Sequence, residues 1–140
     1  MNNKNKGEIG ERIAIGELAK FGIDVLIPLT DNLPFDFVIF YNNKMFKCQV
    51  KTTSNNTDPL EFDLRTNNWY SKTIKIYNEN EVDIFILCDF KEIYIFKFNE
   101  LKNRKTISLR KILPDNGQIK KINLCKDYII SENRIKKIFT

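Results

Sequence analysis

The chain has 140 residues, of which 42% are hydrophobic, and no apolar run is long enough to cross a membrane. Its 23 basic and 18 acidic residues give a net charge of +5, which permits a polyanionic partner without requiring one. The absence of histidine excludes histidine general bases, Cys/His zinc fingers and histidine-metal nucleases. Any hydrolytic chemistry must therefore use carboxylates, lysine and a metal ion.

The start of the sequence, its cysteines and its length also predict the location of the protein, the state of its thiols and the number of domains. The start of the sequence lacks the apolar segment of a secretory signal, so we expect a cytoplasmic protein. The cysteines are odd in number and form no Cys-x-x-Cys motif, which predicts buried free thiols at Cys48, Cys88 and Cys125. The length predicts one domain over residues 1–140, with a core at about 6–112 and a basic extension at 113–140.

The first predicted element is an amphipathic helix over residues 6–22 that ends at Gly22. Its apolar stripe is expected to comprise Ile9, Ile13, Leu18 and Phe21. Glu8 and Glu11 lie one turn apart near its start. They complement the helix dipole, or one of them serves as a functional carboxylate.

A short strand at residues 23–28 is followed by a hairpin at residues 34–52, which turns at the pair Asn42-Asn43. Counting outward from this turn places Asp36 opposite Gln49, with Lys51 diagonally beside them. One face of the hairpin is then expected to carry Asp36, Gln49 and Lys51, and the other Phe35, Phe37, Cys48 and Val50.

A carboxylate, an amide and an ammonium group therefore converge on one face of this hairpin. Asp and Lys are uncommon in strands, and the flanking sequence is strongly apolar, so their placement favours a functional site. The alternative is an ordinary cross-strand ion pair on a solvated face, worth at most about 1 kcal/mol.

The middle of the chain continues with alternating patterns. Residues 60–65 predict a third strand of the sheet, and residues 66–72 a loop or short helix. Three side chains in or beside this segment could contact nucleic acid, or the two aromatic ones could belong to the core or a dimer interface: Trp69, Tyr70 and Lys72. Polar and apolar residues alternate again at residues 72–77.

The most buried strand is expected at residues 82–90, joined by a tight turn at Lys91-Glu92 to a partner strand that ends near residue 98. Helical composition follows at residues 99–105, and a strand is expected at residues 106–113.

The C-terminal region is rich in basic residues interleaved with isoleucines. They form either a phosphate-contacting surface or an ordinary solvated face, and they are Lys120, Lys121, Lys126, Arg134, Lys136 and Lys137.

Three short segments together resemble the PD-(D/E)XK nuclease superfamily: G-E-I-G-E at residues 7–11, D-N-L-P-F-D at 31–36 and Q-V-K at 49–51. The similarity continues at residues 81–85 and 106–110 and covers about residues 4–112. Within the superfamily, the chain is most similar to the group I intron-encoded homing endonucleases. It departs from the usual pattern at Gln49, where most members carry Asp or Glu.

The resemblance implies an α/β fold with a restriction-endonuclease-like mixed sheet of four or five strands, the N-terminal helix on one side and later segments on the other. It implies a catalytic set of Glu11, Asp36, Gln49 and Lys51. The implied ligands for Mg²⁺, which Mn²⁺ can replace, are Asp36, Gln49, the Val50 carbonyl and Glu11. The expected DNA contacts are Arg65, Lys72, Lys120 and Lys121.

The expected function is a metal-dependent double-stranded DNA endonuclease of the homing type, without a small-molecule cofactor. So small a chain that recognises a long site is expected to act as a homodimer or homotetramer. Two alternatives remain open within the nucleases, a Holliday junction resolvase and a restriction-type enzyme. A further alternative is a non-catalytic DNA-binding module whose site has decayed at Gln49.

Overall fold

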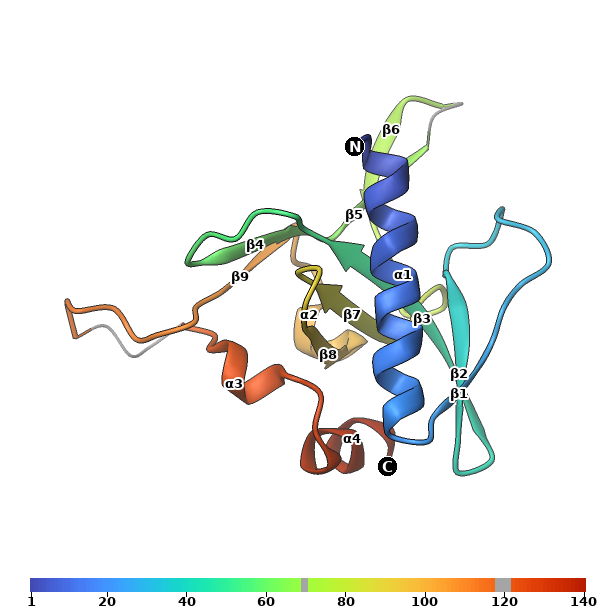
Figure 1. The fold of residues 1–140 in the computed structure, drawn as a ribbon. Helices are drawn as coiled ribbons and strands as arrows, with labels where there is room; N and C mark the ends of the chain where they lie inside the picture. Colours follow the sequence, from blue (N-terminus) through green and yellow to red (C-terminus); the bar gives the residue numbers. More distant parts are fainter. Residues whose placement is uncertain (69–70, 118–121) are drawn as a thin grey trace.

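A five-stranded mixed sheet forms the centre of the computed structural model, which describes residues 1–68, 71–117 and 122–140 (Figure 1). Only β3 and β7 run parallel, and the other neighbours are antiparallel. In spatial order the strands are β1 (Asp24–Leu26), β2 (Phe37–Tyr41), β3 (Lys44–Thr52), β7 (Ile84–Cys88) and β8 (Ile93–Lys97). The predicted α/β architecture is confirmed.

Helix α1 (Asn3–Lys20) begins three residues before the predicted start. The reason is a cap, because the Asn2 side chain accepts a hydrogen bond from the Asn5 backbone N–H at 2.9 Å. Gly22 ends the helix as predicted, with a φ of +71° that a residue with a side chain rarely adopts.

The buried face of α1 differs from the predicted stripe. Its buried residues are Gly10, Ala14 and Leu18, whereas Ile9, Ile13 and Phe21 are only partly buried. The predicted stripe is confirmed at Leu18 and wrong at the other three positions, because small side chains bring the helix close to the sheet and larger residues flank the contact. A β-carbon at position 10 would overlap the side chain of Thr52 on β3.

The β2–β3 hairpin forms as the sequence predicts. Asn42 and Asn43 adopt φ values of +51° and +59°, the conformation that a two-residue primed turn requires. Tyr41 pairs with Lys44, and Phe37 pairs with Cys48. The register counted outward from the turn is therefore confirmed along β2.

Strands β7 and β8 are the most buried pair, as predicted, and every residue of β7 is buried. The side chains of alternate residues pack on opposite faces of the sheet. Ile84 and Ile86 pack with α1, whereas Phe85 and Leu87 pack into a second cluster. The sheet is thus covered on both sides.

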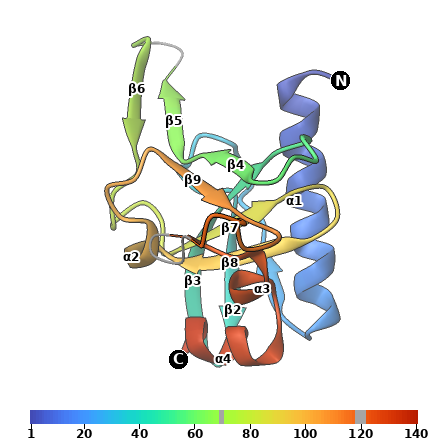
Figure 2. The same cartoon turned by 90° about the vertical axis from the view of Figure 1, so that its left-hand side faces the viewer.

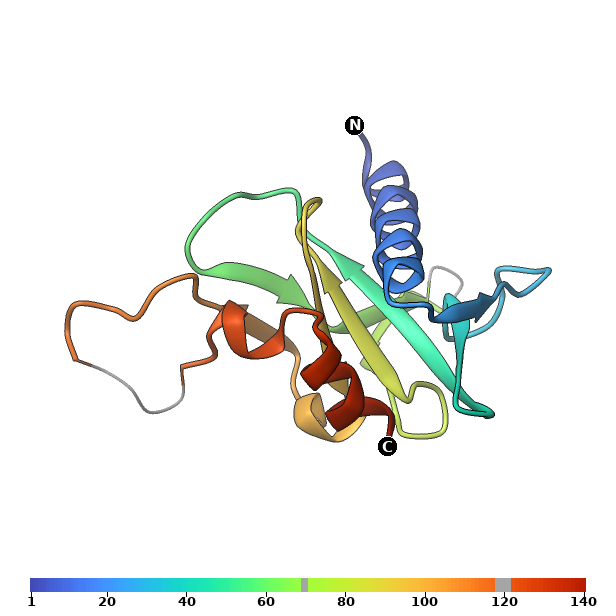
Figure 3. The ribbon, with the colours of Figure 1, turned by 60° about the horizontal axis from the view of Figure 1, so that its bottom comes forward.

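Helix α4 (Glu132–Phe139) joins α1 in the first cluster, through Ile135, Ile138 and Phe139. The core therefore extends beyond the expected boundary at residue 112. The second cluster is covered by a separate two-stranded sheet and two short helices, which are β4 (Leu60–Asp63), β9 (Thr106–Leu109), α2 (Phe98–Leu101) and α3 (Cys125–Tyr128) (Figure 3).

Two expectations for the middle of the chain need correction. The strand predicted at residues 60–65 exists as β4, but it pairs only with β9 and lies outside the main sheet. The loop or short helix predicted at residues 66–72 is instead partly a strand, since β5 (Arg65–Asn68) pairs with β6 (Thr73–Ile76). Trp69 and Tyr70 lie outside the described residues.

Strands β5 and β6 form a hairpin, here called the β5–β6 arm, that projects beyond the sheet at the same end of the molecule as the start of α1 (Figures 1 and 2). Every residue of β6 is exposed, including Ile74 and Ile76. The arm contributes little to the core beyond its base.

Arg134 does not face solvent, which corrects its expected role in phosphate contact. Its side chain is 6% exposed and donates to the Ile95 carbonyl oxygen at 2.7 and 3.0 Å and to Glu100 at 2.8 Å. The bonds to Ile95 cover the outer edge of β8. Lys126, Lys136 and Lys137 are exposed, whereas Lys120 and Lys121 fall outside the described residues.

The three cysteines are buried free thiols, as expected. Among the described residues, no helix is both long and apolar enough to cross a membrane.

Candidate active site

Asp36 is held against β3 by a pair of hydrogen bonds. Its backbone N–H donates to the Cys48 carbonyl at 2.8 Å, and its Oδ2 accepts the Val50 backbone N–H at 2.7 Å. The antiparallel pairing of β2 and β3 thus continues one residue beyond β2, with a carboxylate in place of a backbone carbonyl. This arrangement fixes the orientation of the Asp36 side chain.

Glu11 comes from α1 and meets Asp36. Burial, followed by the charge of Asp36 and a hydrogen bond between the two side chains, raises the pKa of Glu11 to about 8. Burial also raises the pKa of Asp36, against the opposing effect of the Val50 N–H. Both carboxyls are therefore harder to ionise than a carboxyl group in water.

The close approach of α1 to β3 brings these two carboxyls together. Gly10 lies directly against Thr52, and Glu11 is the next residue along the helix. Because position 10 has no β-carbon, the helix can lie near enough for Glu11 to reach Asp36.

Lys51 is the most enclosed cation of the site. Its Nζ donates to the Arg65 carbonyl at 2.7 Å and lies 5.1 Å from the centre of the Tyr77 ring. Burial lowers the pKa of Lys51, and the negative charge of Asp36 partly opposes that shift. Gln49 lies on the same face of β3, and its amide Nε2 donates to the Val50 carbonyl at 3.3 Å.

The carboxyl pair opens into a hollow of about 540 Å³ that solvent can enter. Glu11 and Asp36 line it together with residues 27–31. Leu29 in this lining is fully exposed. The hollow is therefore a place where an extended substrate can reach the two carboxyls.

The oxygen donors that the sequence predicts suit a hard divalent cation. They are two carboxylates, the Gln49 amide oxygen and the Val50 carbonyl, and such donors are the ones that Mg²⁺ prefers. No group of three acidic or cysteine side chains converges anywhere in the described part of the chain. The site thus has fewer charged donors than a site with Asp or Glu at position 49.

The residues expected to contact DNA differ in their surroundings. Arg65 forms a two-point contact with Asp63, with nitrogen–oxygen distances of 2.9 and 3.0 Å, so its guanidinium already has a partner. Lys72 is exposed in the connection between β5 and β6. Tyr77, which contacts Lys51, was not identified from the sequence, because an aromatic residue at the end of an alternating strand is indistinguishable from a core residue.

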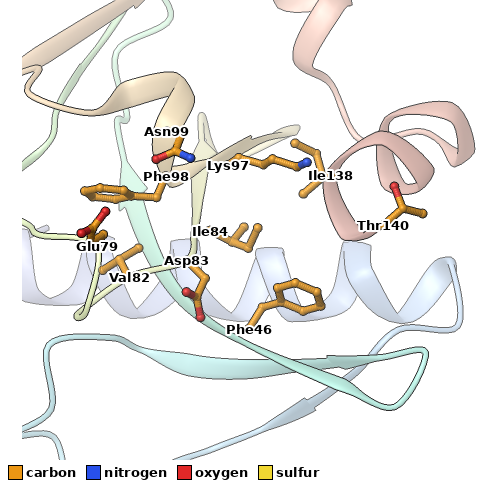
Figure 4. A pocket seen from close by; sticks show the side chains of 10 residues that line it. All are labelled: Phe46, Glu79, Val82, Asp83, Ile84, Lys97, Phe98, Asn99, Ile138 and Thr140. Atoms are coloured by element: carbon orange, nitrogen blue, oxygen red, sulfur yellow. The ribbon is translucent and has the colours of Figure 1, made fainter.

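A second aspartate contacts β3 in a similar way. Asp83 lies just before β7, its N–H donates to the Lys47 carbonyl at 2.9 Å, and its Oδ2 accepts the Lys47 N–H at 2.9 Å. It lines a hollow of about 330 Å³ together with mostly apolar residues, including Phe46, Phe98 and Ile138 (Figure 4).

Comparison with known proteins agrees with this geometry. Residues 1–131 match the sequence model of the PD-(D/E)XK endonucleases, and the chain belongs to that family. Among solved structures it is similar to a bacterial homing endonuclease, I-Ssp6803I, with a TM-score of 0.71 and 26% sequence identity. That similarity covers 92% of this chain and 89% of the other. No curated protein sequence matches.

Proposed function

We propose that this endonuclease hydrolyses phosphodiester bonds of double-stranded DNA with a divalent metal ion, and that it acts as a homing endonuclease. The observation that carries the proposal is the convergence of Glu11, Asp36 and Lys51 beside the open hollow. Membership of the PD-(D/E)XK endonucleases supports it, since nucleases of this family generally use divalent metals.

The residues that would hold Mg²⁺, or Mn²⁺ in its place, are Asp36, Glu11, Gln49 through its amide oxygen and Val50 through its carbonyl. When bound, the ion would polarise the phosphate and favour deprotonation of an attacking water. Glu11 would bind the ion in its deprotonated form, so metal affinity would rise as the pH approaches the raised pKa of Glu11.

Lys51 acts on the phosphate and the attacking water. Its Nζ, anchored by one hydrogen bond to the Arg65 carbonyl, has N–H groups left to donate to a phosphate oxygen and to orient a water molecule. Burial strengthens this electrostatic contribution, because fewer water molecules screen it.

DNA binding in this proposal comes from basic residues outside the hollow. Lys72 on the arm is exposed, and Arg65 lies at its base. Lys120 and Lys121 are proposed as further phosphate contacts. Affinity from such contacts is independent of sequence and falls with salt, because each phosphate contact releases counterions.

The homing assignment derives from the similarity to I-Ssp6803I, whose title describes a homing endonuclease. A homing enzyme recognises a long DNA site, so we propose a homodimer or homotetramer that presents one active site to each DNA strand.

The test is cleavage of supercoiled plasmid DNA with Mg²⁺, with and without EDTA, by the wild-type chain and Lys51→Ala. We expect nicked and linear products from the wild type only, and only with the metal. A gel shift without any cleavage would instead identify a non-catalytic DNA-binding module.

The same assay separates the kinds of nuclease. A long duplex site with approximate two-fold symmetry, selected from a randomised library, is the expected best substrate. Faster cleavage of a four-way junction would identify a junction resolvase, and a short palindromic site a restriction-type enzyme.

A further inference from the structure

The position of Lys51 depends on the base of the β5–β6 arm. Its Nζ donates to the carbonyl of Arg65, the first residue of β5, at 2.7 Å. Its other close neighbour is the ring of Tyr77, which directly follows β6 and lies 5.1 Å away. Both strands of the arm thus contact the lysine.

Tyr77 is itself fixed in place. It is 8% exposed, and its hydroxyl lies close enough to the side chain of Thr66 on β5 to interact with it. Its ring packs edge-on against Phe85 of β7, with centroids 5.7 Å apart. The ring therefore joins the arm to the most buried strand of the sheet.

The ring and the carbonyl hold the ammonium group in complementary ways. An aromatic face attracts a cation without using its N–H groups, and a carbonyl oxygen uses one N–H. The hydrogen bond of Nζ goes to a neutral carbonyl, so the charge of the lysine is not neutralised by a carboxylate at that contact. The remaining N–H groups can serve the reaction.

We propose that Tyr77 is a positioning residue for Lys51, which sets the location of the ammonium group relative to Asp36 and links the placement of the arm to cleavage. This inference rests on the proposed function of Lys51. A displacement of a catalytic group by about 1 Å can cost as much as 10²-fold in rate. Loss of the ring should therefore slow the reaction more than it weakens DNA binding.

The experiment compares Tyr77→Leu, Tyr77→Phe and the matched control Phe98→Leu. Phe98 belongs to the same apolar cluster and stacks on Phe85 at 6.1 Å, so its loss should cost similar stability without touching Lys51. The measurements are kcat and KM for DNA cleavage and the thermal unfolding midpoint. If Tyr77→Leu unfolds below the assay temperature, Tyr77→Met replaces it.

We expect an about 10-fold lower kcat for Tyr77→Leu, which is half of the 10²-fold limit on a logarithmic scale, with KM nearly unchanged. Tyr77→Phe should keep most of the kcat, because the ring face remains. Phe98→Leu should lower the unfolding midpoint as Tyr77→Leu does but leave kcat unaltered. Equal kcat values for the two leucine variants, or equal losses for Tyr77→Phe and Tyr77→Leu, would overturn the proposal.

A second measurement does not require cleavage. Acetylation of Lys51 by an amine-reactive reagent, followed by mass spectrometry, reports how firmly Nζ is held, with Lys47 as the internal reference. Lys51 should react several-fold faster in Tyr77→Leu than in Phe98→Leu. An unchanged rate would contradict the positioning role, whereas an inactive wild type with the expected acetylation pattern would refute only the nuclease mechanism.

Discussion

Asp36 and Asp83 make almost the same contact with β3 but lie in different surroundings. Each precedes a strand that neighbours β3 and accepts a β3 backbone N–H, at 2.7 Å for Asp36 and 2.9 Å for Asp83. Asp36 also meets the Glu11 carboxyl and the charge of Lys51. Asp83 instead lines a hollow in which apolar side chains alternate with polar ones, among them the exposed Glu79 and the partly exposed Lys97 (Figure 4).

The difference shows that a carboxylate bonded to a strand amide is by itself a structural feature. A second carboxylate supplied by α1 and a buried lysine on β3 distinguish the candidate active site. Variants that treat the two aspartates alike can test this distinction.

The largest expected effect is the loss of cleavage in Asp36→Asn. The amide can still accept the Val50 N–H, so the fold should persist, but a charged metal ligand is lost. We expect kcat to fall by about 10³-fold or more, as for other essential catalytic groups, with DNA binding largely retained. Plasmid nicking and gel-shift assays measure the two quantities.

Asp83→Asn is the matched control, because it changes the equivalent contact outside the site. It should cleave DNA at the wild-type rate. If both variants lost activity equally, the contact with β3 rather than the carboxylate pair would be what matters.

A smaller effect is expected for Glu11→Gln, which removes the charge that α1 brings to Asp36. Ligand-shell changes of this kind typically cost about 10- to 100-fold in metal affinity. Calorimetry with Ca²⁺ as a non-catalytic ion should show this weakening. Glu79→Gln, at the rim of the second hollow, should bind Ca²⁺ as the wild type does.

Gln49→Glu tests the departure from the family pattern, and it should raise metal affinity where Glu11→Gln lowers it. Divalent affinity rises with the number of charged ligands, so we expect the Mg²⁺ concentration for half-maximal cleavage to fall by about 10-fold or less. A variant that needs as much metal as the wild type would show that Gln49 does not contact the ion.

A further effect concerns the pH dependence of stability in EDTA. The pKa of Glu11 is about 8 in the folded protein, against an ordinary value of 4.5, so the unfolded chain loses its proton first as the pH rises. The free energy of unfolding should therefore fall between pH 4.5 and pH 8. Thermal unfolding at pH 5 and pH 8 measures it, and the decrease should be smaller in Glu11→Gln.

Local signals in the sequence predict the part of the site on the hairpin. Asn42-Asn43 fixes the turn, and the turn fixes which residues face one another, so Asp36, Gln49 and Lys51 follow by alternation. The family resemblance adds Glu11, whose contact with Asp36 depends on how α1 packs.

Packing between distant segments is what the sequence does not reveal. The partner of β4 is β9, which lies more than forty residues later in the chain. The buried line of α1 is set by space at Thr52 rather than by hydrophobicity. Arg134 looks like a surface cation because its partners, Ile95 and Glu100, are adjacent only in the folded chain.

The parallel pairing of β3 and β7 has a consequence for how such enzymes diversify. Parallel neighbours must be joined by a crossover of about a dozen residues or more, and here residues 53–83 form it. The β5–β6 arm lies within this stretch. The reach of the arm can therefore change through insertion, deletion or exchange while every strand of the main sheet keeps its neighbours. In the proposed function, such a change would alter the contacts of the arm with DNA while Asp36, Glu11 and Lys51 keep their elements.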